Sequence, residues 1–305
     1  MRPHAPPAPT ITFRTAMLSF LGILFDGLAY GTLLFLISVG LSVTLGLMGF
    51  INLAHGVFAM AGGYLLVFLM AHIGLGFFES LPLVFLVIAL ASVVLERLLY
   101  RPLYRSTALD QVLLTIGVVF IAVAGANWIW GPGQQPVTLP EILDGQVSLG
   151  GIGLSRYHLF LIVVGATLTL LLVFGLERTH FGARIRASVD RQRTAEAMGI
   201  DVVRVFQLTF AIGSGLAGLG GALGVTVLGL DPYFPLKFLV YFLLVVVVGG
   251  PGTVTGTLLA GLLLGVADVV GKYYVPDLGG FVIYVAMIVL LVAFPHGLLG
   301  RRAST

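Results

Sequence analysis

The chain has 305 residues, of which 58% are hydrophobic and only 10% are charged, and its mean hydropathy is +1.08. A water-soluble domain carries about 25% charged residues, so this composition excludes an ordinary soluble globular protein. The net charge of +3 does not indicate nucleic-acid binding, because the basic residues cluster in short loops and at the C-terminus, as topology signals do. The absence of cysteine excludes disulfides, thiolate metal sites and cysteine nucleophiles.

The N-terminal segment, MRPHAPPAPT, has four prolines and no apolar core, so we expect a disordered tail that extends to residue 16. The apolar stretch that follows continues into a full span without a signal-peptide cleavage pattern. Residues 17–302 are predicted to form a single transmembrane domain.

Apolar runs near 20 residues recur along the chain, and they are solid rather than alternating, which favours helices over the strands of a barrel. The predicted fold class is an all-α integral membrane protein, a polytopic bundle of eight or nine transmembrane helices. The seventh span is short, which indicates a half-helix or a tilted insertion. The predicted spans are residues 24–47, 51–71, 82–95, 111–130, 158–176, 205–228, 237–248, 253–270 and 281–294.

The placement of Lys and Arg predicts the orientation. The connection 96–110 carries three arginines and is expected in the cytoplasm, as is the basic segment 177–205 two crossings later. The intervening loop 131–157 has one arginine and many Gly and Pro residues, which suits the external face. Counting back puts the N-terminus outside, although Arg2 and Arg14 count against that side.

The segment 177–205 holds six of the sixteen Lys and Arg residues and four acids, between long apolar runs. Residues 182–199 can form one or two short amphipathic helices, with Ile185, Val189 and Met198 facing the membrane or a partner. A solvated loop that only fixes the topology is the alternative. The length and helical character of the segment favour a docking role.

Small residues are spaced for close helix packing in the span 205–228, at Gly213, Ala217 and Gly221 and again at Gly220 and Gly224. This spacing does not fit a dinucleotide fingerprint.

The stretches 49–65 and 249–265 resemble each other, because each has a Gly-containing break followed by a helix rich in small residues. Interrupted spans at matching positions indicate a substrate pathway. Whether the two stretches are a true internal repeat stays open.

Asn52 and His55 are the unusual polar pair of the early membrane region. They can cap the helix start, with Asn52 as the N-cap, or line a translocation route, and both roles can hold at once. Asp26, Asp268 and Lys237 lie near span ends, where anchoring at the membrane interface is the favoured interpretation. Because none of these charges looks deep, the pattern counts against a proton-coupled transporter.

The sequence lacks the motifs of an enzyme. It has no GxxxxGK[ST] phosphate loop, no HExxH and no GxSxG, and its six histidines show no metal-binding pair. We therefore predict no catalytic residue, no metal and no cofactor.

Several stretches in chain order resemble the permease subunits of ATP-binding-cassette importers for branched-chain amino acids. Together they cover roughly residues 20 to 302, and the chain looks more like the first, H-type permease than its longer M-type companion. The stretches are GFINLAHG, LERLLYRPLYRSTA with LTIGV, the segment from Gly182 through AEAMGI to Phe210, GGPGTVTGTLLAGLLLG, and FPHGLLG.

The resemblance implies a permease domain in the bacterial inner membrane, surrounded by membrane lipid. It implies a second homologous permease, two cytoplasmic ATP-binding-cassette ATPases that hydrolyse the ATP, and a periplasmic substrate-binding protein as partners, with no nucleic acid. The expected translocation-pathway residues are Asn52, His55, Gly56, Gly250, Gly252 and Thr253. The expected ATPase-coupling residues are Arg186, Asp190, Arg191, Glu196, Ala197 and Gly199.

The chain also departs from the family pattern. Val57 stands where the family often has an acid, and the loop 250–256 lacks the common Ile/Ser-containing version. The substrate therefore stays open between branched-chain amino acids and related small polar solutes such as urea or amides. An ion-coupled secondary transporter that works without ATPases is the alternative from another class.

Overall fold

The computed structural model describes residues 13–50, 52–149, 152–190, 192–295 and 297–299. Within these residues, eight helical segments are long and apolar enough to cross a membrane, and a ninth apolar helix is shorter. The fold is thus the predicted polytopic α-helical bundle, and the short seventh span is a helix of 16 residues, Phe234–Gly249.

The helices are α1 (Phe13–Met48), α2 (His55–Phe68), α3 (Phe77–Leu95), α4 (Ala108–Trp130), α5 (Arg156–Glu177), α6 (His180–Asp190), α7 (Gln192–Ala197), α8 (Val202–Leu228), α9 (Phe234–Gly249), α10 (Val254–Tyr274) and α11 (Gly279–Ala293). Short π or 3-10 turns extend α2 to Ile73 and α3 to Arg105, and one precedes α11 at Pro276–Leu278.

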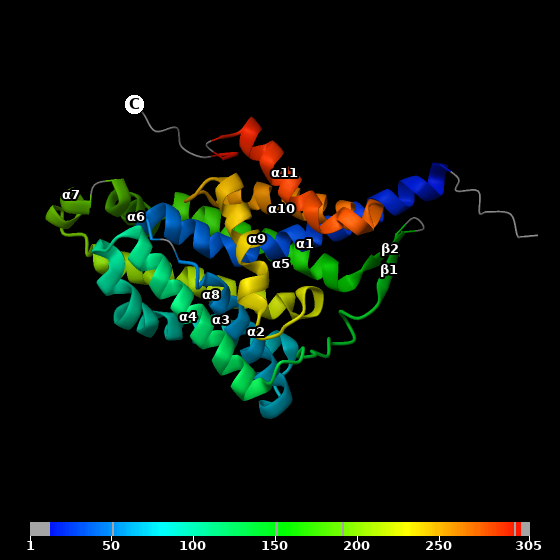
Figure 1. The fold of residues 1–305 in the computed structure, drawn as a ribbon, viewed down its shortest axis with the longest axis horizontal. Coiled ribbons are helices and arrows are strands. Elements are labelled where there is room, and N and C mark those ends of the chain that lie inside the picture. The colour runs from blue at the N-terminus through cyan, green and yellow to red at the C-terminus, as the bar shows by residue number, and fades with distance from the viewer. Residues whose placement is uncertain (1–12, 51, 150–151, 191, 296, 300–305) are drawn as a thin grey trace, which may run out of the picture.

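The two ends of the bundle carry different connections (Figure 1). One end holds α6 and α7, the turn Arg101–Arg105 and the C-terminal residues 297–299, where Leu298 N donates to Val248 O over 2.7 Å. The other end holds the loop 131–155, which contains a short antiparallel hairpin of β1 (Gln146–Leu149) and β2 (Ile152–Ser155). This division agrees with the orientation that the arginines predict.

The structure differs from the sequence-based expectation at the N-terminus and in the external loop. Helix α1 begins at Phe13, so residues 13–16 are helical and not part of a tail, while residues 1–12 lie outside the described residues. The hairpin was not expected in the external loop, since the sequence QVSLGGIGLS was interpreted as Gly-rich loop.

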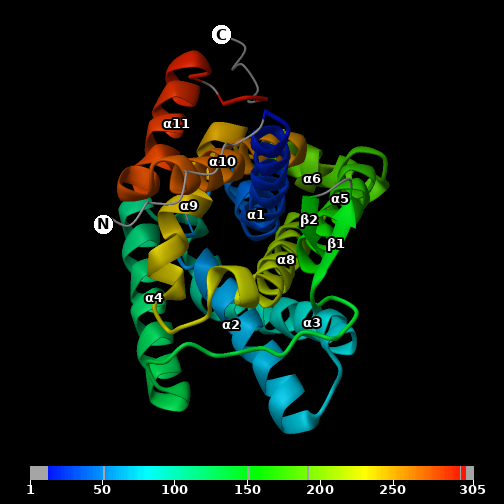
Figure 2. The ribbon, with the colours of Figure 1, turned by 90° about the vertical axis from the view of Figure 1, so that its right-hand side faces the viewer.

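Helix α1 lies at the centre of the bundle, with α10, α8, α5 and α9 around it (Figure 2). Its middle section is buried on all sides, from Gly31 to Thr44. A helix that is apolar around its whole circumference is typical of such a central position.

Glycine lets the helices approach α1 until their backbones touch. A Cβ atom at Gly31 would lie 2.6 Å from the carbonyl oxygen of Gly261 and 2.7 Å from Cα of Leu262, both on α10. A Cβ atom at Gly40 of α1 would lie 2.1 Å from the carbonyl oxygen of Gly213 in α8. Real Cβ atoms do not fit at such distances from backbone, so these contacts require glycine.

The small-residue face of α8 also packs against α2, as the spacing in the sequence predicts. A Cβ atom at Gly221 would lie 2.7 Å from Cα of Ala59, and one at Gly62 would lie 2.5 Å from Cα of Gly218. The α8 glycines therefore serve helix packing on two sides, toward α1 and toward α2.

We expect Gly31→Ala to lower the midpoint of thermal unfolding in detergent, because the added methyl group pushes α10 away from α1 at a cost of about 1–3 kcal/mol. Gly117→Ala in α4 is the matched control, since a Cβ atom at Gly117 has nothing within 4 Å and the substitution raises helix propensity. Thermal-shift measurements on both variants test this, and equal midpoints would contradict the backbone-contact interpretation.

Candidate functional site

The polar start of α2 lies in the interior of the bundle. Asn52 is 1% exposed and His55 is 2% exposed. The Nε2 atom of His55 lies 2.8 Å from the carbonyl oxygen of Ile37 in α1, and because a carbonyl only accepts, Nε2 carries the proton. His55 thus fastens the start of α2 to the middle of α1.

Asn52 is not the N-cap of α2, because the helix begins at His55 and the N-cap position is Ala54. Its Oδ1 atom instead accepts a hydrogen bond of 3.1 Å from Ala54 N, so it shapes the turn before the helix. The Nδ2 atom of Asn52 is buried and has no partner in the described structure. A buried amide group without a hydrogen-bond partner costs folding free energy. Its presence here favours a functional role for Asn52 in addition to its role in the turn.

Gly56 allows α9 to approach α2. A Cβ atom at Gly56 would lie 3.1 Å from Cα of Pro235 and 3.4 Å from the ring of Phe242. The first group of predicted pathway residues therefore lies where α1, α2 and α9 meet.

The second group, Gly250, Gly252 and Thr253, forms a tight corner between α9 and α10. Gly250 and Gly252 have φ values of +93° and +82°, which only glycine adopts without strain. Gly252 N donates to Ser42 O of α1 over 2.9 Å, and Thr253 Oγ1 donates to Gly250 O over 2.8 Å. Both groups contact α1, but the corner lies at the end of the bundle that carries α6 and α7.

Among the predicted coupling residues, Glu196 and Ala197 are exposed on α7, and Gly199 ends that helix. Gly199 has φ +83°, Gly199 N bonds to Glu196 O and Ile200 N bonds to Ala195 O, each over 3.0 Å. This pattern is a Schellman-type helix end, which positions α7 relative to α8. Arg186 and Asp190 belong to α6, and Arg191 lies outside the described residues.

The segment 182–199 forms two short helices, as predicted, but one of its apolar residues faces another way than expected. Ile185 is 2% exposed and shares an apolar pocket with Gly40 of α1, Leu172 of α5 and Thr209 of α8. It therefore anchors α6 to its own bundle and does not face the membrane or a partner. Met198 is 79% exposed and stays available to a partner.

A buried carboxylate that the sequence analysis did not single out connects α3 to α8 beside this segment. Glu96 is fully buried, and its two oxygens accept from Tyr104 Oη over 2.8 Å and from Gln207 Nε2 over 3.0 Å. The sequence gives no local signal for this contact, because Gln207 is more than a hundred residues away.

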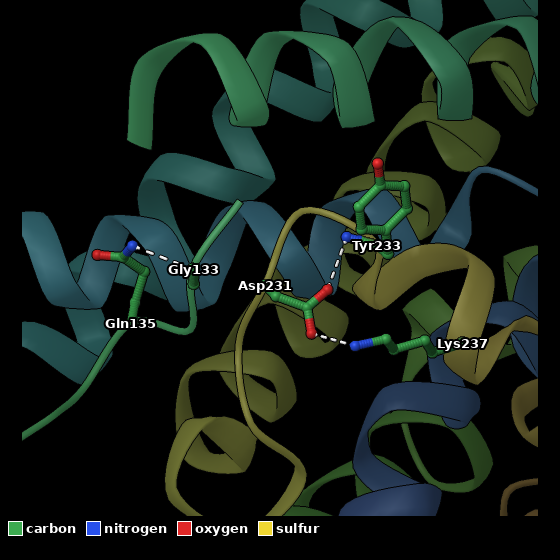
Figure 3. A network of polar contacts seen from close by, with 5 residues as sticks. All are labelled: Gly133, Gln135, Asp231, Tyr233 and Lys237. Atoms are coloured by element: carbon green, nitrogen blue, oxygen red, sulfur yellow. Dashed lines mark hydrogen bonds and ion pairs between the residues drawn. The ribbon is translucent and has the colours of Figure 1, made fainter. Parts of the chain in front are cut away.

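A second polar cluster lies at the start of α9 (Figure 3). Asp231 shapes the turn before the helix, since its Oδ1 atom accepts from Tyr233 N over 2.9 Å, and its Oδ2 atom pairs with the ammonium of Lys237. The outer loop reaches over this cluster, because Gln135 N donates to Leu230 O over 2.9 Å. Lys237 is therefore the partner of a buried acid.

The other two charged span residues are also paired. Asp268 is fully buried and pairs with Lys272 Nζ at 2.5 Å, which contradicts the expectation that it reaches the interface. Asp26 Oδ1 lies 2.7 Å from His158 Nδ1 at the opposite end from α6, and its side chain is half-exposed, as expected for the interface. The basic partner stands four residues after Asp268 and six residues after Asp231, so local spacing is the sequence signal that could have predicted both pairs.

These features define the class of the protein, a polytopic helical membrane protein with charged groups inside its bundle and a polar helical pair at one end. A family model described as the permease component of the branched-chain amino acid transport system matches residues 23–291. The chain belongs to this family of branched-chain amino acid transport permeases.

Relatives of the H type match along almost their whole length. The high-affinity branched-chain amino acid transport system permease protein BraD of Pseudomonas aeruginosa is 30% identical, over 92% of this chain and 96% of the relative. LivH of Salmonella typhimurium is 27% identical over 93% and 96%. LivM of the same organism is 26% identical, but this chain covers only 67% of it. The resemblance to the H-type permease is thus confirmed, and the chain is a multi-pass bacterial membrane protein. No solved structure matches.

We expect Glu96→Ala to lower thermal stability by about 1–3 kcal/mol, because Tyr104 and Gln207 lose their buried acceptor. Glu141→Ala, which removes an exposed carboxylate in the outer loop, should leave the stability within about 0.5 kcal/mol. Thermal unfolding in detergent measures both, and an unchanged midpoint for Glu96→Ala would contradict a structural role of this carboxylate.

Proposed function

We propose that this chain is one transmembrane subunit of an ATP-binding-cassette importer for branched-chain amino acids in the inner membrane. With a second, homologous permease it forms the translocation path, and two cytoplasmic ATPases supply the energy. A periplasmic binding protein delivers the substrate. The chain performs no chemistry of its own.

The observation that carries this proposal is the helical pair α6 and α7. The pair projects from the end of the bundle (Figure 1), and Arg193 and Glu196 of α7 are exposed, as is Met198 directly after the helix. An exposed apolar residue among charged residues suits contact with a protein partner. Met198 is that residue, because its side chain would lose unfavourable contact with water when a partner covers it.

The connections of this pair support the transmission of a movement into the membrane part. Ile185 fixes α6 to α1, α5 and α8, and the Gly199 turn leads directly into α8, where Asp201 Oδ1 accepts from Arg204 N over 3.0 Å. Helix α8 contacts α1, α2 and α3. A partner that displaces α7 therefore acts on the helices around α1, which suits a path that opens alternately to the two sides.

The family relationship supports the substrate class. The printed names of BraD and LivH describe permeases of branched-chain amino acid transport systems. Urea, amides and other small polar solutes remain alternatives within the proposal, since the soluble receptor of such an importer selects the solute.

The coupling role is tested with the double variant Glu196→Ala, Gly199→Trp in the complete importer reconstituted in liposomes. Tryptophan at Gly199 strains the helix end and blocks the surface, so ATP-driven leucine uptake should fall to background while the soluble receptor still binds leucine. Arg178→Ala, at the same end but outside α6 and α7, is the control and should retain uptake. Normal uptake by the assembled double variant would refute the coupling role.

An ion-coupled secondary transporter is the second candidate, and the intramembrane pair of Asp231 and Lys237 is the observation that favours it. The two candidates differ in what the purified chain does alone in liposomes. We expect no leucine uptake by the chain alone under a proton or sodium gradient, measured with radiolabelled leucine. Gradient-driven uptake without ATPases would replace the importer proposal.

A further inference from the structure

Helix α9 has 16 residues, fewer than a full membrane span needs, and it starts inside the bundle. Its residues Phe234 and Pro235 are buried, and Pro235 lies against Gly56 of α2. Its other end, Gly249, reaches the corner that contacts α1. A helix that begins in the membrane interior brings polar groups of its first turn to a depth where water is normally absent.

The depth of Lys237 follows from the packing at the start of α9. Pro235 lies against Gly56, and the neighbouring His55 contacts Ile37 O within the apolar span Met17–Gly46 of α1. Helix α9 runs across the long axis of the bundle (Figure 1), so Lys237, two residues after Pro235, lies in the membrane part. A charge at such a depth needs a partner or water.

The side chain of Asp231 is 9% exposed, whereas that of Lys237 is 53% exposed. The carboxylate is thus held in place by Tyr233 N and Lys237. About half of the Lys237 side chain is exposed on the surface of the subunit. The first turn of α9 offers no free amide to an anion, because Phe234 N, Leu236 N and Lys237 N already bond to Asp231 and Tyr233. The cationic group at this place is the ammonium of Lys237.

Lys237 belongs to an exposed face of α9. Tyr233, Leu236, Val240 and Val247 are 49%, 39%, 43% and 43% exposed, and their spacing puts them on one side of the helix with Lys237. Figure 2 shows α9 between α4 and α11, both of which it contacts. A site for a polar solute on this face requires a water-filled space beside it, because lipid does not solvate charged groups.

A spare hydrogen-bond donor lies nearby. The hydroxyl group of Tyr64 in α2 is buried and has no partner in the described structure, and Tyr64 is close enough to Asp231 for an electrostatic interaction. Its ring packs against Trp130 with 4.4 Å between the ring centroids. The neighbouring residue Gly63 touches Leu230, which precedes Asp231.

We propose that Asp231 and Lys237 form an intramembrane binding site for the zwitterionic backbone of an α-amino acid on its way through the path. The carboxylate of the amino acid pairs with Lys237 and its ammonium group with Asp231. Leu236 and Val240 contact the apolar side chain. This site rests on the proposed function and adds to it the residues that receive the substrate.

The pair suits a transient site for a physical reason. When the site is empty, Asp231 and Lys237 neutralise each other, and when a zwitterion is bound, each charge has a partner on the substrate. No buried charge is left unpaired in either state, so the zwitterion can enter and leave without a large penalty. A transport site must bind its solute weakly enough to release it.

Water access is tested by cysteine labelling, which the absence of native cysteine in this chain makes possible. Val240→Cys in the assembled importer should react with the water-soluble reagent methanethiosulfonate ethylammonium at least roughly tenfold faster than Val285→Cys, because a thiolate forms in water and not in lipid. Val285 is 57% exposed on α11 and is the control. Mass spectrometry of this subunit gives both rates, and equal rates would overturn the water-filled face.

Charge recognition is tested with Asp231→Asn, Lys237→Met, in which asparagine still accepts from Tyr233 N. We expect ATP-driven leucine uptake to fall roughly tenfold or more, because the charge-assisted bonds to the zwitterion are lost. ATP hydrolysis stimulated by the leucine-loaded receptor should persist. Leucine should protect Val240→Cys from the reagent in the parent chain but not in this variant.

Asp268→Asn, Lys272→Met is the matched control, since it removes another pair of a buried aspartate and a half-exposed lysine. It should retain uptake. Equal uptake by the two double variants, or leucine protection that survives the loss of Asp231 and Lys237, would overturn the site. A parent importer that takes up leucine without ATP would instead refute the proposed function, so the two failures are distinguishable.

Discussion

The contact between helix backbones through glycine is the constraint on which the rest of this structure depends. Gly31 against Gly261 and Gly40 against Gly213 bring α10 and α8 to α1 at distances that any side chain would prevent. In a membrane, helices do not associate by excluding water, so dispersion contacts of this kind hold the bundle together. Helix α1 is thereby enclosed, and the other helices take their positions from it.

Two helices, α2 and α9, begin in the interior of the bundle beside α1. His55 attaches the start of α2 to Ile37, and Gly56 admits the start of α9 beside it. Irregular backbone is tolerated at this depth because its polar groups find partners, such as Tyr233 N on Asp231 and Gln135 N on Leu230 O. The interrupted segments place Asn52, Tyr64 and Asp231 in the interior of the bundle.

The same packing connects the end that carries α6 and α7 to the interior. Glu96 holds α8 to the turn after α3, and Ile185 holds α6 against α1, α5 and α8. A displacement of α7 would therefore act on α8, which contacts α1 along the glycine face, and through α8 on α2. This continuous set of contacts is a physical connection between the proposed docking surface and the proposed path.

The sequence by itself determined the helical membrane fold, the short seventh span, the helical character of residues 182–199, the glycine face of α8 and the family. These features arise from local composition and periodicity, which the membrane makes decisive because every span must satisfy its own backbone. Only the tertiary structure decided that Ile185 turns inward, that Glu96 meets Gln207 and that Asp268 is fully buried. Those outcomes depend on which distant helix lies opposite a side chain, and periodicity along one segment carries no information about that.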